Sequence, residues 1–458
     1  MNHQIDSLGT EKINKLIASF SLPAIIGMLV MASYNIVDRI FVGRGVGTLA
    51  ISGIAISFPI SILIIGFGQL IGMGATALIS IKLGEKKKDE AENILGTAFL
   101  MIIIVGFLLS ATIYLCMVPV LKILGGSGEV LHFAERYLRI LLLGIPLQLV
   151  SFALNGIIRA EGNPRMALAT ILIGGGLNII LNPVFIFVLH FSIEGSALAT
   201  IISQLVSAIW VFIYFTNKKS YLQLKLKLIR FNKKVILKIL SIGVSPFMMQ
   251  ATGSVITIIF NKTLLEYGGN IAVAVMSIGN SIMMLIMMPI FGLNQGIQPI
   301  IGYNYGAKNI ARVKETFKMG LIIATSICTA GFIAIELFSR NILSVFNSTD
   351  MHMISLGSHA LKVFLIMLPL SGFQIVIWAY FQAVGKPKQS IILTMSKQVL
   401  IIVPLVLILP HFFNLEGVWM TAPIADFCSA CLAIVLIYRE LKHLNSIKPE
   451  EVVVKTII

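Results

Sequence analysis

The sequence predicts an all-α integral membrane protein with twelve transmembrane helices in two pseudo-symmetric six-helix lobes around a central cavity. Three observations lead to this fold class: an apolar composition, long uncharged stretches separated by short charged loops, and an internal repeat. Of the 458 residues, 57% are hydrophobic and only 12% are charged, about half the charged share of an ordinary soluble protein. This composition excludes a soluble enzyme, a disordered chain and a secreted disulfide scaffold.

Charged residues divide the chain into apolar stretches long enough to cross a bilayer, which takes about 20 helical residues. The stretches are continuous and do not alternate, so they predict helices and not the strands of a membrane barrel. Two later stretches each contain one charge, at Lys397 and at Asp426. The uncharged ones span residues 16–37, 45–81, 93–121, 140–158, 166–193, 195–217, 239–261, 267–307, 319–335 and 363–385.

The two halves of the chain resemble each other at a nearly constant offset of about half the chain length. Pro23 aligns with Pro246, and the sequence AEGNPR at 160–165 aligns with AVGKPK at 383–388. Six spans in each half give both halves the same orientation, and two such lobes suit a transporter that works by alternating access. We expect an N-lobe at 1–217, a basic interlobe linker at 218–234 and a C-lobe at 235–458.

Basic residues indicate the orientation, because they accumulate in cytoplasmic loops. Most of the 35 lysines and arginines fall in loops on the side of the N-terminus. We therefore expect both termini in the cytoplasm of a bacterium, with the chain in the plasma membrane. The net charge of +15 is explained in this way without nucleic acid as a partner. The basic residues of the opposite loops are Arg39, Arg44, Lys122, Lys262 and Arg340.

Four polar residues of the first lobe are expected at a similar depth in the membrane. A helical rise of about 1.5 Å per residue places Asp38 about 28 Å from the cytoplasmic side, and Asn178, Asn182 and Thr200 between about 20 and 25 Å. An ionisable side chain at such depth costs about 2.5–3.5 kcal/mol, which makes Asp38 a functional candidate. A carboxylate, two amides and a hydroxyl offer oxygen ligands for a hard cation such as Na⁺, and Asp38 alone could carry a proton.

Structural roles remain open for the same residues. Asp38 could pair with Arg39 or Arg44 near the outer surface. The two amides and the hydroxyl could serve only as hydrogen-bonding groups between helices.

A second set of polar residues is expected near the middle of the C-lobe. Lys397 and Asp426 both reach the midplane on adjacent spans, which predicts a buried ion pair. Such a pair could hold the lobe together, or it could act in substrate binding or gating. Gln250 and Asn261 are further polar candidates for substrate contact. Met287 belongs to a methionine-rich span that could form an adaptable substrate surface or simply face lipid.

No catalytic or nucleotide-binding motif is apparent, so we expect neither an enzyme nor a cofactor. The chain has no P-loop sequence that would bind ATP. Cys428 and Cys431 form a C-x-x-C without a second ligand pair, which favours helix packing over a metal or redox site.

The motifs SLPAIIGMLVMASYNIVDRIFVGRG from residue 21, NGIIRAEGNPRMA from residue 155 and GYNYGAKNIARVKE from residue 302 resemble the multidrug and toxic compound extrusion (MATE) family. The chain is most similar to its bacterial DinF/MepA-like branch, and the resemblance covers nearly the whole chain. It implies a secondary antiporter that exports varied, often cationic, amphipathic drugs in exchange for Na⁺ or H⁺.

The resemblance also implies a cation-coupling site in the first lobe. The family's aspartate of the first span falls on Asp38, and a tyrosine one turn earlier falls on Tyr34. Its asparagine of span five falls on Asn178, and its threonine of span six on Thr200. The sequence departs from the family at Asn182, where many members carry a second aspartate, so the site loses one negative charge.

Related transporters of the same superfamily move lipid-linked precursors across the membrane, and such a flippase is the alternative function. The predicted twelve spans and the single midplane Lys397 argue against it. As partners we expect small-molecule substrates and the lipid bilayer, and we expect a monomer.

Overall fold

The computed structural model describes residues 2–217, 220–346 and 351–446, and within these ranges the chain folds into helices without a strand. The elements are α1 (Asn2–Thr10), α2 (Ile13–Gly45), α3 (Thr48–Gly84), α4 (Lys88–Ile123), α5 (Gly128–Ala160), α6 (Pro164–Pro183), η1 (Val184–Val188), α7 (Ile193–Thr216), η2 (Leu226–Leu228), α8 (Lys233–Gly306), α9 (Ile310–Phe346), α10 (Met351–Phe364), α11 (Leu368–Ala383), α12 (Pro387–Met395), η3 (Ser396–Ile402) and α13 (Val403–Ser446).

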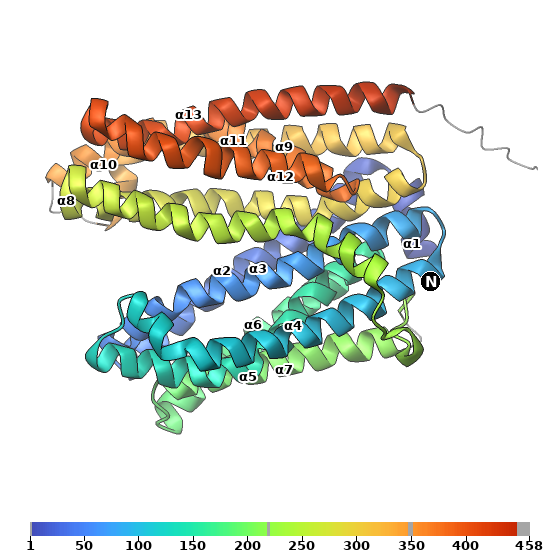
Figure 1. Ribbon diagram of the computed structural model, residues 1–458, viewed down its shortest axis with the longest axis horizontal. Helices are drawn as coiled ribbons and strands as arrows, with labels where there is room; N and C mark the ends of the chain where they lie inside the picture. Colours follow the sequence, from blue (N-terminus) through green and yellow to red (C-terminus); the bar gives the residue numbers. More distant parts are fainter. Residues whose placement is uncertain (1, 218–219, 347–350, 447–458) are drawn as a thin grey trace, which may run out of the picture.

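Two of these helices each contain two membrane crossings. The chain reverses direction inside α8 at Gly269, with φ 64°, and inside α13 at Asn414, with φ 49° (Figure 1). The described part of the chain has nine helices apolar enough to span a membrane, and α10 and α11 form a further span bent by 45°. Dividing α8 and α13 at their reversals gives twelve crossings, so the predicted fold class is confirmed.

The internal repeat is visible in the backbone. Four positions with positive φ recur at nearly the offset of the sequence repeat, and each lies in a turn between consecutive spans. Because positive φ is uncommon outside glycine, its recurrence shows that both halves use the same turns. The equivalent positions are Gly47 and Gly269, Lys86 and Lys308, Gly162 and Gly385, and His190 and Asn414.

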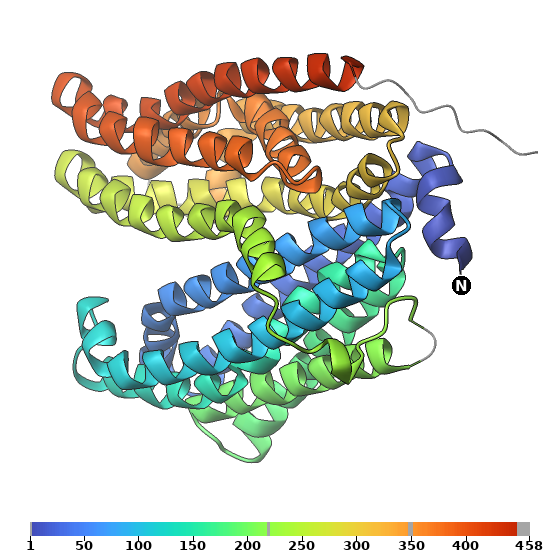
Figure 2. The same ribbon diagram turned by 45° about the vertical axis from the view of Figure 1, so that its right-hand side comes forward.

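The helices form two groups, α2–α7 and α8–α13, which lie side by side with their axes along the bundle (Figures 1 and 2). Helix α1, the segment between α7 and α8, and the last turns of α13 all lie at one end of the bundle, which we call the inner end. The opposite end is called the outer end. The two lobes approach each other at the inner end and diverge toward the outer end.

Side-chain exposure agrees with this arrangement. At the inner end, Gly296 of α8 lies so close to Ser21 of α2 that a Cβ on the glycine would meet the serine backbone nitrogen at 2.7 Å. Farther along the same helices, Ile36 of α2 is 60% exposed and Ile258 of α8 is 64% exposed. The two lobes are therefore in contact toward the inner end and apart toward the outer end (Figure 1).

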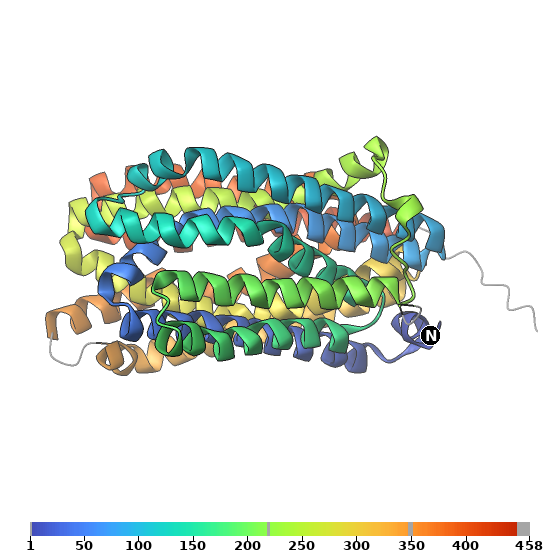
Figure 3. The same ribbon diagram turned by 90° about the horizontal axis from the view of Figure 1, so that it is seen from below.

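The segment between the lobes packs against the N-lobe. Glu92 of α4 accepts a hydrogen bond from the backbone of Gln223 at 3.2 Å and pairs with Lys225 at 2.5 Å. Seen from the side of the N-lobe, this segment crosses the inner end (Figure 3). Residues 218–219 of the predicted linker lie outside the described residues, and α8 begins at Lys233, just before the predicted end of the linker.

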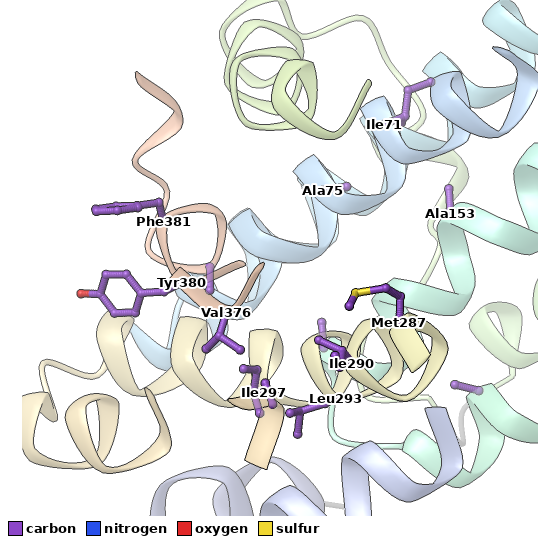
Figure 4. Close-up of a cluster of buried hydrophobic side chains, with 14 of the residues drawn as sticks. Ile71, Ala75, Ala153, Met287, Ile290, Leu293, Ile297, Val376, Tyr380 and Phe381 are labelled. Carbon is purple, nitrogen blue, oxygen red and sulfur yellow. The ribbon is translucent and has the colours of Figure 1, made fainter. Parts of the chain in front are cut away.

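A continuous apolar core joins the lobes near the inner end. Ile71 of α3, Leu293 of α8 and Val376 of α11 belong to one cluster (Figure 4). Met287 lies in the same cluster and is only 4% exposed. The expectation that Met287 offers an adaptable substrate surface does not hold in this conformation, because helix rotation turns its side chain into the core, while Met284 is exposed.

Candidate functional site

The first candidate site surrounds Asp38, which is 9% exposed in the middle of the N-lobe. Asn182 of α6 donates its side-chain amide to Asp38 Oδ1. Ser196 of α7 donates its hydroxyl to the same oxygen at 2.6 Å. Three helices that are far apart in the sequence thus converge on one carboxylate.

A second hydrogen bond lies one helical turn away. Asn178 lies one turn before Asn182 on α6, and Thr200 lies one turn after Ser196 on α7. The Asn178 amide donates to Thr200 Oγ1 at 3.1 Å. The structure therefore brings together the four polar residues that the sequence places at similar depth, in two adjacent layers between α6 and α7.

One oxygen of this site is unpartnered. Asn182 is fully buried, and within the described part of the chain its Oδ1 accepts no hydrogen bond. A buried polar atom without a partner costs free energy unless a ligand or water satisfies it. Carboxylate, amide and hydroxyl oxygens together fit a hard monovalent cation, or Asp38 alone can take a proton. No group of three or more histidine, cysteine or acidic residues that could hold a metal occurs among the described residues.

Two tyrosines complete the surroundings of Asp38. Tyr34 lies one turn before Asp38 on α2 and is half-buried, with its ring beside Gly175 of α6. Tyr137 of α5 is buried and lies next to Asp38 and Ser196. The sequence analysis missed Tyr137 and Ser196. Ser196 lies one turn before Thr200 on the same helix, and this spacing could have predicted that both face the site. No feature of the sequence indicated Tyr137.

Asp38 does not pair with either neighbouring arginine. Among the described residues it forms no ion pair, and Arg39 instead lies over the Phe58 ring at 5.5 Å from its centroid. Arg39 and Arg44 are both exposed. The alternative that Asp38 serves as a surface ion-pair partner is therefore not supported by the geometry.

The second candidate site lies in the C-lobe, where Lys397 and Asp426 form the predicted ion pair. Ser371 donates to the other carboxylate oxygen of Asp426 at 3.0 Å. Gln374 donates to the Asp426 backbone oxygen at 2.6 Å and accepts from Lys397 at 3.4 Å. Lys397 lies in η3, a π-helical segment, and such segments are frequent at functional sites. The sequence analysis missed Ser371 and Gln374.

Gln250 and Asn261 do not join this ion pair in the structure. They lie on one face of α8 with Ser254 and Thr257, since successive members are three or four positions apart, a spacing that keeps side chains on one side of a helix. Gln250 is half-buried and Asn261 is exposed. These four residues form an uncharged polar stripe on α8. The stripe lies on the outer side of Gly243, the residue of α8 that contacts α3. Cys428 and Cys431 are both free and exposed.

The sequence profile of the MatE family matches residues 23–184 and, a second time, residues 246–408. The chain belongs to the MatE family. It is 30% identical over 426 residues to the multidrug export protein MepA of Staphylococcus haemolyticus (strain JCSC1435), which covers 93% of each chain. It is therefore a multi-pass membrane transporter and not an enzyme.

Solved MATE structures have the same fold. A MATE crystal structure in the bent conformation matches with a TM-score of 0.90 and 27% identity, over 96% of this chain and 98% of the other. An outward-facing multidrug resistance MATE transporter matches with a TM-score of 0.90 and 26% identity, over the same shares. The second likeness agrees with the separation of the lobes at the outer end.

Proposed function

We propose that the protein is a secondary antiporter that exports drugs or other amphipathic organic compounds in exchange for Na⁺ or H⁺. The inner end would face the cytoplasm of a bacterium, in keeping with the basic residues of its loops. Membership of the family and the likeness to a relative named a multidrug export protein support drug export. The observation that carries the coupling is Asp38, a buried carboxylate that accepts hydrogen bonds from neutral polar groups and forms no ion pair with a basic side chain among the described residues.

The replacement of the family's second aspartate by Asn182 supports a site that works with one carboxylate. An aspartate at position 182 could donate a hydrogen bond to Asp38 only while it carried a proton. The amide of Asn182 donates permanently and leaves its oxygen for a ligand. Asp38 then provides the single charge that an incoming cation or proton neutralises in each cycle.

In this cycle the coupling ion enters from the outer end, where the lobes are apart, and binds at Asp38. Charge neutralisation changes the packing of α2 against α6 and α7, and the substrate leaves to the outside. After the lobes open at the inner end, the ion leaves to the cytoplasm and a new substrate binds.

The test is transport of a fluorescent cationic dye in proteoliposomes, with a Na⁺ gradient and a pH gradient imposed separately. We expect one gradient to drive dye movement in the wild type and Asp38→Asn to abolish it. Asp89→Asn, the same chemical change at an exposed aspartate of α4, is the matched control and should retain transport. Dye movement of normal rate in Asp38→Asn would contradict the proposed coupling site.

A further inference from the structure

The inner end is closed by a pair of glycines that the internal repeat makes equivalent. Gly84 ends α3 and Gly306 ends α8, the corresponding helix of the other lobe. A Cβ on Gly84 would lie 1.9 Å from the carbonyl oxygen of Tyr303, and a Cβ on Gly306 would lie 2.0 Å from that of Ile81. Tyr303 and Ile81 also occupy equivalent positions of the repeat, so each lobe presents the same contact to the other.

The same close approach continues along α3 and α8. A Cβ on Gly74 would meet the Ile239 carbonyl oxygen at 2.2 Å, and a Cβ on Gly243 would meet that of Leu70 at 1.7 Å. Any side chain at these positions would force the backbones apart, because the obstructing atoms are main-chain oxygens. We call the contacts of Gly74, Gly84, Gly243 and Gly306 the glycine seam.

Helix α1 crosses this seam from one lobe to the other. It is joined to α2 of the N-lobe through residues 11–12, yet its backbone is bound by the C-lobe. Arg312 of α9 donates to the carbonyl oxygens of Leu8 at 3.1 Å and Glu11 at 2.7 Å. Asn304 of α8 donates to the Leu8 carbonyl at 2.9 Å and accepts from Arg312 at 3.1 Å.

These contacts satisfy groups that the helix cannot satisfy itself. The last carbonyl groups of a helix have no partner within it, and here a charged guanidinium and an amide of the other lobe supply the donors. Leu8 is fully buried, and Gly9 of α1 lies beside the ring of Tyr303, a residue of the glycine seam. Helix α1 thus forms a strap over the place where the two backbones touch.

The segment that precedes the C-lobe contacts the N-lobe through different groups. The residues equivalent to Asn304 and Arg312 are Lys82 and Glu90, which form an ion pair with each other at 2.9 Å. The segment equivalent to α1 contains η2, which packs on α4 of the N-lobe, where a Cβ on Gly96 would lie 2.4 Å from the Leu228 carbonyl oxygen. The two segments therefore contact the opposite lobes in different ways: α1 is held by Arg312 and Asn304, and the η2 segment packs on α4.

We propose that α1, held by Arg312 and Asn304, is a latch that stabilises the state in which the inner end is closed. Opening the inner end separates the seam, and Arg312 must then release the carbonyl groups of Leu8 and Glu11. The latch thereby sets the equilibrium between the state that is closed at the inner end and the state that is open there. This inference rests on alternating access but does not depend on the coupling ion or on Asp38.

The test is the accessibility of a single cysteine in the seam, in the full-length protein with its native cysteines replaced. Ser80 is fully buried and lies against Gly302 of the other lobe, so Ser80→Cys reacts with a hydrophilic maleimide only when the inner end opens. We expect Arg312→Gln to raise the labelling rate about tenfold, because hydrogen bonds from a charged donor are lost. Lys318→Gln, the same loss of charge at an exposed site of α9, should leave the rate unchanged.

Two further variants separate the latch from the seam. Removal of residues 2–10 should raise the labelling rate as much as Arg312→Gln does. A protein with both changes should be labelled no faster than either single variant, because both changes remove the same contact between α1 and Arg312. Gly84→Ala should raise labelling by forcing the backbones apart, whereas Gly176→Ala, whose added methyl would meet nothing within 4 Å, should not. Unchanged labelling in Arg312→Gln and in the deletion, beside increased labelling in Gly84→Ala, would overturn the latch.

No ion gradient or substrate enters this experiment. A failure of Asp38→Asn to affect transport would refute the coupling site and leave the labelling result as it stands. Conversely, a labelling rate that does not respond to Arg312 would refute the latch without touching the coupling site.

Discussion

Lys397 and Asp426 form an ion pair in the C-lobe, with side chains that are only 27% and 10% exposed. Lys397 occupies the place that a mobile cation would take, and Ser371 satisfies the second carboxylate oxygen. The N-lobe differs, because Asp38 is bound by an amide and a hydroxyl and has no basic partner among the described residues. The chain therefore carries one buried carboxylate with its own counter-ion and one without.

Removing one member of the C-lobe pair should cost far more stability than removing both. Lys397→Met leaves Asp426 buried without a counter-ion, and we expect a loss of about 3–5 kcal/mol. The double variant Lys397→Met with Asp426→Leu should recover most of that loss. Thermal unfolding of the purified proteins measures both effects. If the double variant is as unstable as Lys397→Met alone, the unpaired charge of Asp426 does not cause the loss of stability.

The same double variant decides the role of the pair in transport. Normal dye transport by the double variant would show that the pair serves structure alone. A transport defect in a protein that unfolds at the wild-type temperature would assign the pair to substrate binding or gating.

Ser196 should contribute to ion affinity. Ser196→Ala removes a hydrogen bond to the Asp38 carboxylate, and bonds to charged groups contribute about 1.5–3 kcal/mol. We expect the ion concentration for half-maximal dye transport to change by about tenfold. Ser203→Ala is the matched control on α7, because the Ser203 hydroxyl donates only to the Ala199 carbonyl of its own helix at 2.7 Å. Equal effects of the two variants would exclude a specific role for Ser196.

Arg39 should influence which substrates the outer end accepts. It follows Ser21 by about five helical turns, and so shares the face of α2 that contacts the C-lobe at the inner end. Its positive charge repels organic cations where the lobes diverge. We expect Arg39→Gln to lower the half-saturating concentration of a cationic dye about two- to threefold at low salt, and less at high salt. Arg340→Gln serves as the control at another exposed site; an equal effect there would indicate only a change in net charge.

Glu161 gives a pH dependence of stability. It lies in the loop after α5, where burial raises its pKa to about 7, while hydrogen bonds from Tyr214, Ser220 and the Leu222 backbone oppose that rise. The folded state holds the proton more tightly than the unfolded one. The resulting stability is present below about pH 4.5 and is lost as the pH rises to about 7.

The Glu161→Gln variant tests this dependence. Relative to this variant, the wild type should lose stability on the order of 3 kcal/mol between pH 4.5 and 7.5, measured as the difference in thermal unfolding. A difference that does not vary with pH would show that Glu161 keeps the same protonation in both states.

The fold followed from the sequence because the bilayer fixes span length. Apolar stretches predicted twelve crossings, and the repeat around Pro23 and Pro246 predicted two lobes of equal orientation. Depth along a helix also followed, because the rise per residue of a helix is constant, which is why Asp38, Asn182 and Thr200 were expected together.

Side-chain direction could not be predicted in the same way. Depth alone does not tell which side of a helix faces a neighbour, so Tyr137 escaped notice and Met287 was expected to face either substrate or lipid. The latch was missed for another reason: its donors, Arg312 and Asn304, bind main-chain oxygens of α1, and main-chain acceptors leave no mark in a sequence.

The central claim is that substrate and ion movements are coupled through Asp38. The most direct measurement imposes only a dye gradient across proteoliposomes and records Na⁺ and H⁺ fluxes, because an exchanger that couples two movements can run in either direction. We predict that the dye gradient drives one of these ions in the opposite direction in the wild type and neither ion in Asp38→Asn. Dye that crosses at equal rates in both proteins, with no movement of either ion, would contradict the account.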